Sequence, residues 1–212
     1  MTGVLQPMIA GLDVATSTGV CFGRVGEKPQ FLSQRFKGDD TDFMGIVEAV
    51  EAAMVWTIGF IKTVRPDYLV IEAPLEFTPS AGTARTTIKL TSLAINIAAV
   101  AKAKSVPVRF AKVSTVRRTL LGPGGGGLKG DHGKREVMRF CRAAGWEPAT
   151  HDQSDAGAVW WFMGRELRPQ IAQPMDSVSL GIAPVEAEQK RGGARERVRI
   201  APKNFRRGDG NA

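Results

Sequence analysis

Two apolar runs that each carry an acidic residue at one end constrain this chain most strongly. Asp13 lies near the end of the run from Met8 to Ala15, and Glu72 lies near the end of the run from Tyr68 to Ala73, just before Pro74. Short apolar runs bounded by turn signals are typical of buried strands. We therefore predict two core strands of one sheet, each with a carboxylate at the sheet edge.

The order of the predicted elements indicates an α/β fold. A turn at Thr16 to Gly19 follows the first strand and starts an antiparallel meander, and Asp42 is placed to cap a long helix. Three such strands followed by helix, strand, helix, strand and helix are the order of a ribonuclease-H-like fold. We therefore expect a central five-stranded mixed sheet, a three-strand antiparallel meander plus two parallel strands, flanked by helices. The other predicted elements are strands at 20–25, 30–36 and 107–111 and helices at 43–64, 83–104, 114–121, 133–145 and 152–167.

Two further acids, Asp152 and Asp155, lie three residues apart at the start of a predicted helix, so their side chains leave the same helix face. Bringing four carboxylates together near apolar strand ends is unfavourable unless a cation neutralises them. Oxygen ligands suit a hard divalent ion, so we expect Mg²⁺, with Mn²⁺ as a substitute, and phosphate chemistry. For each acid alone a helix cap or a surface charge is the competing interpretation, most seriously for Asp152 as an N-cap.

The charge of the chain suggests a polyanionic partner. Its 212 residues include 29 Lys and Arg against 21 Asp and Glu, a formal net charge of +8. A basic protein with an acidic cluster suggests a polyanion bound by the surface and cut at the cluster, although a merely basic soluble protein explains the charge equally well. We assign residues 1–182 to the ribonuclease-H-like domain and 183–212 to a basic tail that is disordered when free. The tail either binds phosphate or keeps the protein soluble.

The cysteines and the apolar segments indicate a cytoplasmic protein with no membrane association. Cys21 and Cys141 lie in no CxxC pattern and are predicted to be small core residues of a reduced protein. The N-terminus lacks the basic and apolar regions of a signal peptide. The apolar-rich helix near 94–103 is too short and too polar to span a bilayer.

Four short segments, in order along the chain, carry a family resemblance. Ile9–Gly19 contains G-x-D followed by a Thr-Gly turn, and Val70–Glu72 is a second acidic strand. Val116–Gly122 is a basic segment that leads through a glycine-rich break into the helix start Gly133–Val137, and Asp152–Ala156 reads D-x-x-D-A. Together they resemble the RuvC Holliday-junction resolvases and their phage relatives over positions 8 to 168. Each motif is weak alone, whereas the ordered set is fairly specific.

The resemblance implies an endodeoxyribonuclease that nicks branched DNA, such as four-way junctions, symmetrically and as a homodimer. In the two-metal mechanism that it implies, Asp13 bridges the ions, Glu72 and Asp155 each favour one, and Asp152 completes the ligand shell. One ion activates a water and the other stabilises the leaving 3′ oxygen. Lys134 matches the family's lysine at the opening of the next helix and is the further catalytic residue.

The same resemblance implies contacts to DNA. Arg117 lies where the family usually has a lysine near the scissile phosphate, and its forked guanidinium gives a different geometry from an ammonium. Phe77 either stacks on an unpaired base or packs as a hydrophobic staple, and its spacing from Glu72 is longer than in the family. Lys112 and Lys129 are further expected phosphate contacts.

The glycine-rich segment 122–133 lacks the residue order of a nucleotide-binding P-loop. We expect a flexible loop that closes over DNA, longer than its counterpart in the family. Arg118 and Arg135, on either side of this segment, are interpreted as solvated helix charges. His151 either assists water activation or caps a helix.

Three other functions remain open. Another ribonuclease-H-like nuclease would share the same acids and differ in substrate. An actin-like or sugar-kinase-like ATP-binding domain also opens with G-x-D followed by Thr and Gly, but it needs a second lobe. A catalytically silent DNA-binding module has no need of all four acids. In the homodimer, the helix at 83–104 supplies either core or dimer contacts through Ile88, Leu93, Ile95, Ile97 and Val100.

Overall fold

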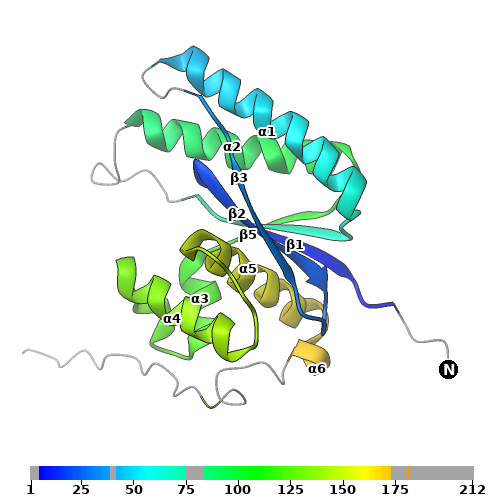
Figure 1. Ribbon diagram of the computed structural model, residues 1–212, viewed down its shortest axis with the longest axis vertical. Coiled ribbons are helices and arrows are strands. Elements are labelled where there is room, and N and C mark those ends of the chain that lie inside the picture. The colour runs from blue at the N-terminus through cyan, green and yellow to red at the C-terminus, as the bar shows by residue number, and fades with distance from the viewer. Residues whose placement is uncertain (1–4, 39–41, 75–83, 173–180, 182–212) are drawn as a thin grey trace, which may run out of the picture.

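The computed structural model describes residues 5–38, 42–74, 84–172 and 181. Within these residues the chain forms a five-stranded sheet whose first three strands are antiparallel and whose last two are added in parallel to the first (Figure 1). The predicted fold class is therefore confirmed. From one edge to the other, the strands are β3 (Gln30–Arg35), β2 (Ser17–Arg24), β1 (Met8–Asp13), β4 (Tyr68–Glu72) and β5 (Val108–Ala111).

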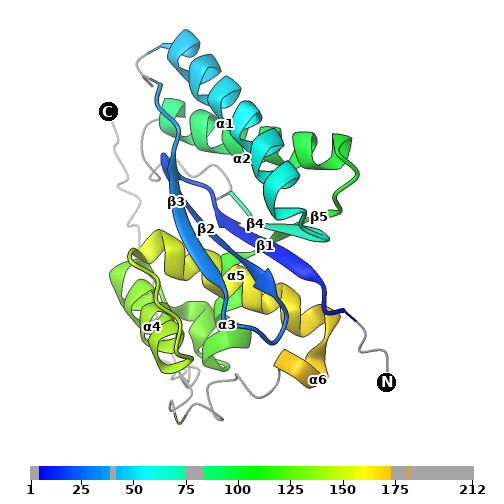
Figure 2. The same cartoon turned by 45° about the vertical axis from the view of Figure 1, so that its right-hand side comes forward.

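Helices cover both faces of this sheet (Figure 1, Figure 2). One face carries α1 (Phe43–Val64) and α2 (Ala84–Ala103). The other face carries α3 (Val113–Leu121), α4 (Gly130–Ala143) and α5 (His151–Leu167), with a 3-10 turn η1 (Gly125–Gly127) before α4 and a short α6 (Pro169–Ala172) after α5. The predicted starts of β2 at 20 and of α4 at 133 were each three residues too late.

The sheet separates two hydrophobic cores because successive strand residues point to opposite faces. On β1, Ile9 packs among α3, α4 and α5, whereas Ala10 and Leu12 pack under α1 and α2. Trp160 and Trp161 of α5 are both buried in the core on this helix's side of the sheet. The cysteines Cys21 and Cys141 are likewise buried and free, as predicted.

Helix α1 begins and ends where the sequence predicts. The side chain of Asp42 accepts a hydrogen bond from the backbone nitrogen of Gly45 at 2.8 Å, and the helix ends at Arg65, which has a left-handed φ of 51°. Among the described residues α1 is the one helix long and apolar enough to cross a membrane, with a mean hydropathy of 1.6, which the sequence analysis overlooked. A core helix of a soluble protein passes the same test; in α1, Ala53 and Phe60 are buried in the core, but only 33% of the apolar stretch is buried.

Helix α5 lies directly on the backbone of the sheet, because glycines in two strands leave room for it. A Cβ atom added to Gly11 of β1 would lie 2.6 Å from the carbonyl oxygen of Ala156 and 2.6 Å from the nitrogen of Trp160. A Cβ at Gly19 of β2 would overlap the backbone carbonyl of Asp152. Real Cβ atoms do not approach backbone so closely, so both positions require glycine for α5 to keep its place.

The close packing of α5 predicts a large effect of one added methyl group. Gly11→Ala should destabilise the protein by about 3 kcal/mol or more, because the clash is with backbone rather than with a movable side chain. Thermal unfolding followed by circular dichroism measures this loss. Gly59→Ala is the matched control: nothing lies within 4 Å of the added methyl on α1, so it should stabilise the protein by about 0.5–1 kcal/mol. Equal effects of the two substitutions would contradict the packing described here.

Candidate active site

Asp13 and Glu72 lie side by side because they end two neighbouring parallel strands. Leu12 of β1 is paired with Ile71 of β4, so the residue after each one leaves the sheet at the same edge. The carboxyl ends of parallel strands are the usual location of functional groups in α/β folds. The sequence-based expectation that these two acids share one sheet edge is therefore met.

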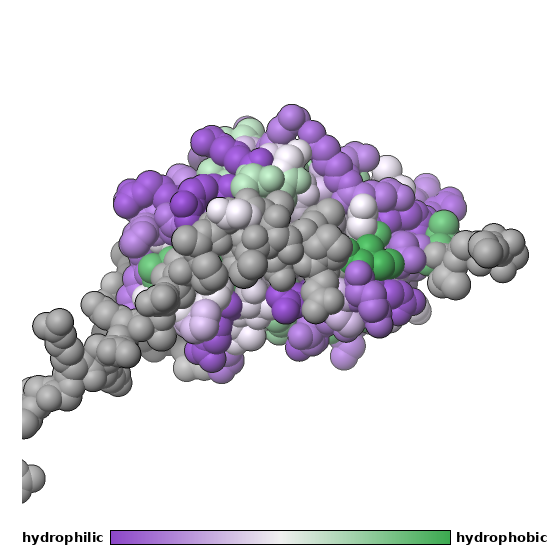
Figure 3. Space-filling model, turned by 90° about the horizontal axis from the view of Figure 1, so that it is seen from below, coloured by the Kyte–Doolittle hydropathy of each residue, from purple (hydrophilic) through white to green (hydrophobic). Residues whose placement is uncertain are grey.

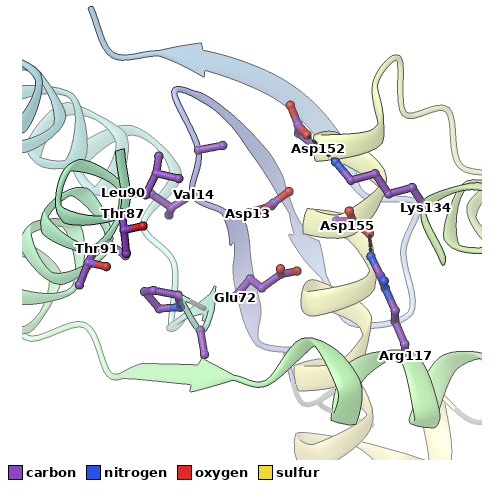
Figure 4. A pocket seen from close by; sticks show the side chains of 14 residues that line it. Asp13, Val14, Glu72, Thr87, Leu90, Thr91, Arg117, Lys134, Asp152 and Asp155 are labelled. Carbon is purple, nitrogen blue, oxygen red and sulfur yellow. Dashed lines mark ion pairs between the residues drawn. The ribbon is translucent and has the colours of Figure 1, made fainter. Parts of the chain in front are cut away.

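Helix α5 adds the other two acids to the same pocket. The side chain of Thr150 caps α5 by accepting a hydrogen bond from the nitrogen of Gln153 at 3.2 Å, so the competing interpretation of Asp152 as the N-cap is wrong. His151 is the first residue of the helix and is not its cap either. Asp152 and Asp155 both line a cavity of about 320 Å³ together with Asp13 and Glu72 (Figure 4).

Two cations face these acids from the neighbouring helices (Figure 4). Arg117 of α3 lies with its Nη2 atom 3.6 Å from Oδ1 of Asp155, and both side chains are less than 10% exposed, at 9% and 6%. The Nη1 atom of Arg117 also donates a hydrogen bond to the carbonyl oxygen of Leu128 at 3.1 Å, which fixes the guanidinium in the wall of the pocket. The Nζ atom of Lys134 of α4 lies 3.7 Å from Oδ1 of Asp152, and this pair is more exposed to solvent than the pair of Arg117 with Asp155.

The pocket holds more negative charge than these cations neutralise. Burial, and then repulsion by Asp155 and Asp152, raise the pKa of Asp13 to about 7. Burial, and then repulsion by Asp13 and Asp155, raise the pKa of Glu72 to about 9. Burial also raises the pKa of Asp155, although the guanidinium of Arg117 and the ammonium of Lys134 act in the opposite direction. At neutral pH Glu72 therefore keeps a proton unless another cation enters.

The donor set fits a divalent metal ion in its chemistry, but its arrangement is not preformed. Carboxylate oxygens are the ligands that Mg²⁺ and Mn²⁺ prefer, and raised pKa values of clustered acids mark a site that gains from added positive charge. Yet across the described residues no three Asp, Glu, His or Cys side chains lie close enough together to hold one metal ion. The ion pairs of Asp155 with Arg117 and of Asp152 with Lys134 contribute to this separation of the acids, because each carboxylate is directed toward a side-chain cation.

The remaining predicted contacts lie elsewhere. Lys112, at the start of α3, and Lys129, before α4, are exposed and are not among the residues that line the pocket. Phe77 lies outside the described residues, as does the tail at 183–212. The segment 122–133, predicted as a loop, is partly helical: it forms η1 and then the first turn of α4, and Gly125 is buried against α3.

Helix α2 supplies one wall of the pocket that sequence reasoning missed. Thr87, Leu90 and Thr91 line it opposite the acids (Figure 4). The available signal was two hydroxyl residues, Thr87 and Thr91, four apart on one face of α2. An isolated pair of this kind is too common on helices to be recognised without knowing that α2 crosses the end of β1.

Comparisons with solved structures identify the architecture. The structure of Thermus thermophilus RuvC is similar, with a TM-score of 0.55 and 17% sequence identity over 84% of this chain and 98% of that chain. T. thermophilus RuvC in complex with Holliday junction substrate is similar with a TM-score of 0.57 and 16% identity over 84% of this chain and 99% of that chain. The chain has the RuvC fold.

The likeness to RuvC is one of structure. No protein-family model matches the chain. The search of curated proteins likewise found no match. In this chain the four acids lie on β1, β4 and α5.

Proposed function

We propose that this protein is a metal-dependent endonuclease that nicks branched DNA, such as Holliday junctions, symmetrically. The observation that carries the proposal is the convergence of Asp13, Glu72, Asp152 and Asp155 in one pocket, with too little positive charge to neutralise them. The RuvC fold supports it, because one of the similar structures is RuvC bound to a Holliday junction substrate. Another ribonuclease-H-like nuclease with a different substrate is the alternative.

In this proposal the acids and the two cations have separate tasks. Asp13, Glu72, Asp155 and Asp152 hold Mg²⁺, or Mn²⁺ in its place. Bound ions of this kind activate a water for attack on a phosphodiester and stabilise the leaving 3′ oxygen. Lys134, whose side chain is 39% exposed, leaves its ion pair with Asp152 and binds the incoming phosphate instead. Arg117 stays in the wall and balances the charge of Asp155.

The test compares four labelled substrates on one gel: a four-way junction, a flap, a duplex and an RNA–DNA hybrid. Paired nicks in the four-way junction that need Mg²⁺ or Mn²⁺ support the proposal. Preferred cutting of the hybrid or the flap would instead support another ribonuclease-H-like nuclease. Binding of Mg-ATP with no cutting of any substrate would favour the ATP-binding alternative.

A homodimer suits this substrate, because a four-way junction has near two-fold symmetry and both cuts must be equivalent. On α2, Leu93 and Ile97 are buried in the core, whereas Ile88 and Ile95 are 42% and 58% exposed. The apolar residues of α2 are therefore divided between a core face and an outer face. The neighbouring helix α1 exposes further large apolar side chains. We propose that a second copy covers this outer layer, whose exposed apolar residues on α1 are Phe43, Met44, Val47, Met54, Val55 and Ile58.

Light scattering tests the dimer directly. The full chain should have twice its monomer mass of 22.8 kDa, and Val47→Glu with Ile95→Glu should reduce it to the monomer. A monomeric wild-type protein would overturn this assignment. The cytoplasmic location, and the DNA contacts of Lys112, Lys129, Phe77 and the basic tail, remain predictions that accompany the proposed function.

A further inference from the structure

A second hollow, of about 500 Å³, lies between α4 and the start of α5. Three arginines recur on one face of α4 at spacings of four and three residues, which places them in one row along the hollow. Of the three, Arg135 was predicted to be a solvated helix charge. The residues that line the hollow are Arg135, Met138, Arg139, Arg142, Ala149, Thr150 and His151.

The positive charge of this hollow is largely uncompensated. Arg139 pairs with Glu136 at 2.7 Å, so one of the three guanidinium groups is neutralised. In the part of the chain that the structure describes, Arg135 and Arg142 form no ion pair, and both are exposed. The N-terminal end of the 17-residue α5, at Thr150 and His151, adds the partial positive charge of its dipole. Guanidinium forks together with a helix N-terminus favour an anion with several oxygens, such as a phosphate.

The hollow adjoins the acidic pocket through two pairs of consecutive residues. On α4, Lys134 lines the acidic pocket and Arg135 lines the hollow; on α5, Asp152 lines the pocket and His151 lines the hollow. The same two helix turns therefore form one wall of both. A ligand that carries one phosphate in the acidic pocket and more phosphates along a chain can reach both at once.

We propose that this arginine hollow binds a backbone phosphate of the DNA strand that is cut, beside the phosphate held at the acidic pocket. The proposal rests on the proposed nuclease function and adds to it a site that fixes the direction of the strand across α4 and α5. Of the residues not drawn in grey, those seen from below are mostly hydrophilic, with small apolar patches (Figure 3). The three arginines that line the hollow suit a charged backbone better than an apolar protein partner.

Binding of a labelled four-way junction tests the hollow. The measurements use the Asp13→Asn protein, so that cutting does not interfere, over a range of salt concentrations. Arg135→Gln/Arg142→Gln removes two charges and keeps the pair of Arg139 with Glu136. We expect about tenfold weaker binding and a salt slope lower by about one, the change for one lost phosphate contact.

The matched control removes two charges from the opposite side of the sheet. Lys102→Gln/Lys104→Gln changes two exposed lysines at the end of α2 and should leave affinity within about twofold of the parent, since distant exposed charges are screened by salt. Equal losses in the two double variants would show general electrostatic attraction only and would overturn the proposed site.

A scan with neutral methylphosphonate linkages locates the contact on the DNA. One position next to the cut should weaken binding of the protein with an intact hollow, and the same change should have no further effect on Arg135→Gln/Arg142→Gln. Additive losses at every position would overturn the proposal. Failure of the nuclease proposal is seen separately, as a wild-type protein that binds junctions without cutting them in Mg²⁺.

Discussion

Asp13→Asn should abolish Mg²⁺-dependent cleavage, lowering the rate by at least about a thousandfold, while DNA binding persists. The carboxylate of Asp13 lies among the other charged groups of the pocket: burial raises its pKa, Asp155 and Asp152 raise it further, and Lys134 and Arg117 lower it. An amide keeps the shape of the side chain but supplies a neutral oxygen in place of the charged one. The basic surface that we propose binds DNA is unchanged, so only the chemical step should be lost. Single-turnover cleavage and a binding assay on the same junction measure the two quantities.

Asp131→Asn is the matched control for this substitution. Asp131 is exposed in the first turn of α4 and does not line the acidic pocket, so its replacement makes the same acid-to-amide change without affecting the four acids. It should leave the cleavage rate within about twofold of wild type. Wild-type cleavage by Asp13→Asn in Mg²⁺ would remove the basis of the nuclease assignment. A circular dichroism spectrum like that of wild type excludes misfolding as the cause of a loss.

The metal-free protein should lose stability as the pH rises from about 4 to 9. Asp13 and Glu72 have pKa values of about 7 and 9 in the folded protein, against 3.8 and 4.5 for the free side chains. The folded state therefore binds more protons than the unfolded state across this range, and each pKa unit corresponds to about 1.4 kcal/mol. The contribution is complete below pH 4 and is lost as the pH rises through the folded pKa of each group. A total loss of several kcal/mol should appear in denaturant unfolding at a series of pH values.

Added Mg²⁺ should reverse this loss at pH 8, because bound metal favours the deprotonated carboxylates and releases protons. Glu72→Gln should flatten the upper part of the pH dependence, between about 7 and 9, since it removes the group that titrates there. Stability that stays constant from pH 5 to 9 without metal would contradict the electrostatic description of the pocket. A melting temperature that does not respond to Mg²⁺ at pH 8 would contradict the proposed metal site.

Residue positions could be predicted best from the sequence where the hydrophobic pattern and the direction of the strands act together. Asp13 and Glu72 end strongly apolar strands, and parallel pairing of those strands then leaves little freedom in where the acids meet. The position of α5 on the sheet was harder to predict from the sequence. Its contact with the sheet depends on Gly11 and Gly19, and a single glycine within a strand does not reveal which helix will approach it.

Other features depend on tertiary contacts that no local pattern encodes. Asp152 resembled a helix cap, but Thr150, two residues earlier, takes that role because its hydroxyl reaches Gln153. The glycines at 125–127 were expected to lie in a loop, yet they form the turn η1, in which Gly125 and Gly126 pack against α3. The burial of Arg117 in the pocket wall and its pair with Asp155 could not be read from the sequence either, and its predicted contact with phosphate stays a prediction.

The absence of side chains at Gly11 and Gly19 limits which substitutions this protein can accept in evolution. Because α5 contacts the strand backbone at these two glycines, they set the spacing between Asp13 on the sheet and Asp155 on the helix. A displacement of about 1 Å between groups that act together can lower a reaction rate about a hundredfold. A side chain at either position would therefore act twice: it would lower the stability of the fold, and in molecules that still fold it would move Asp155 away from Asp13.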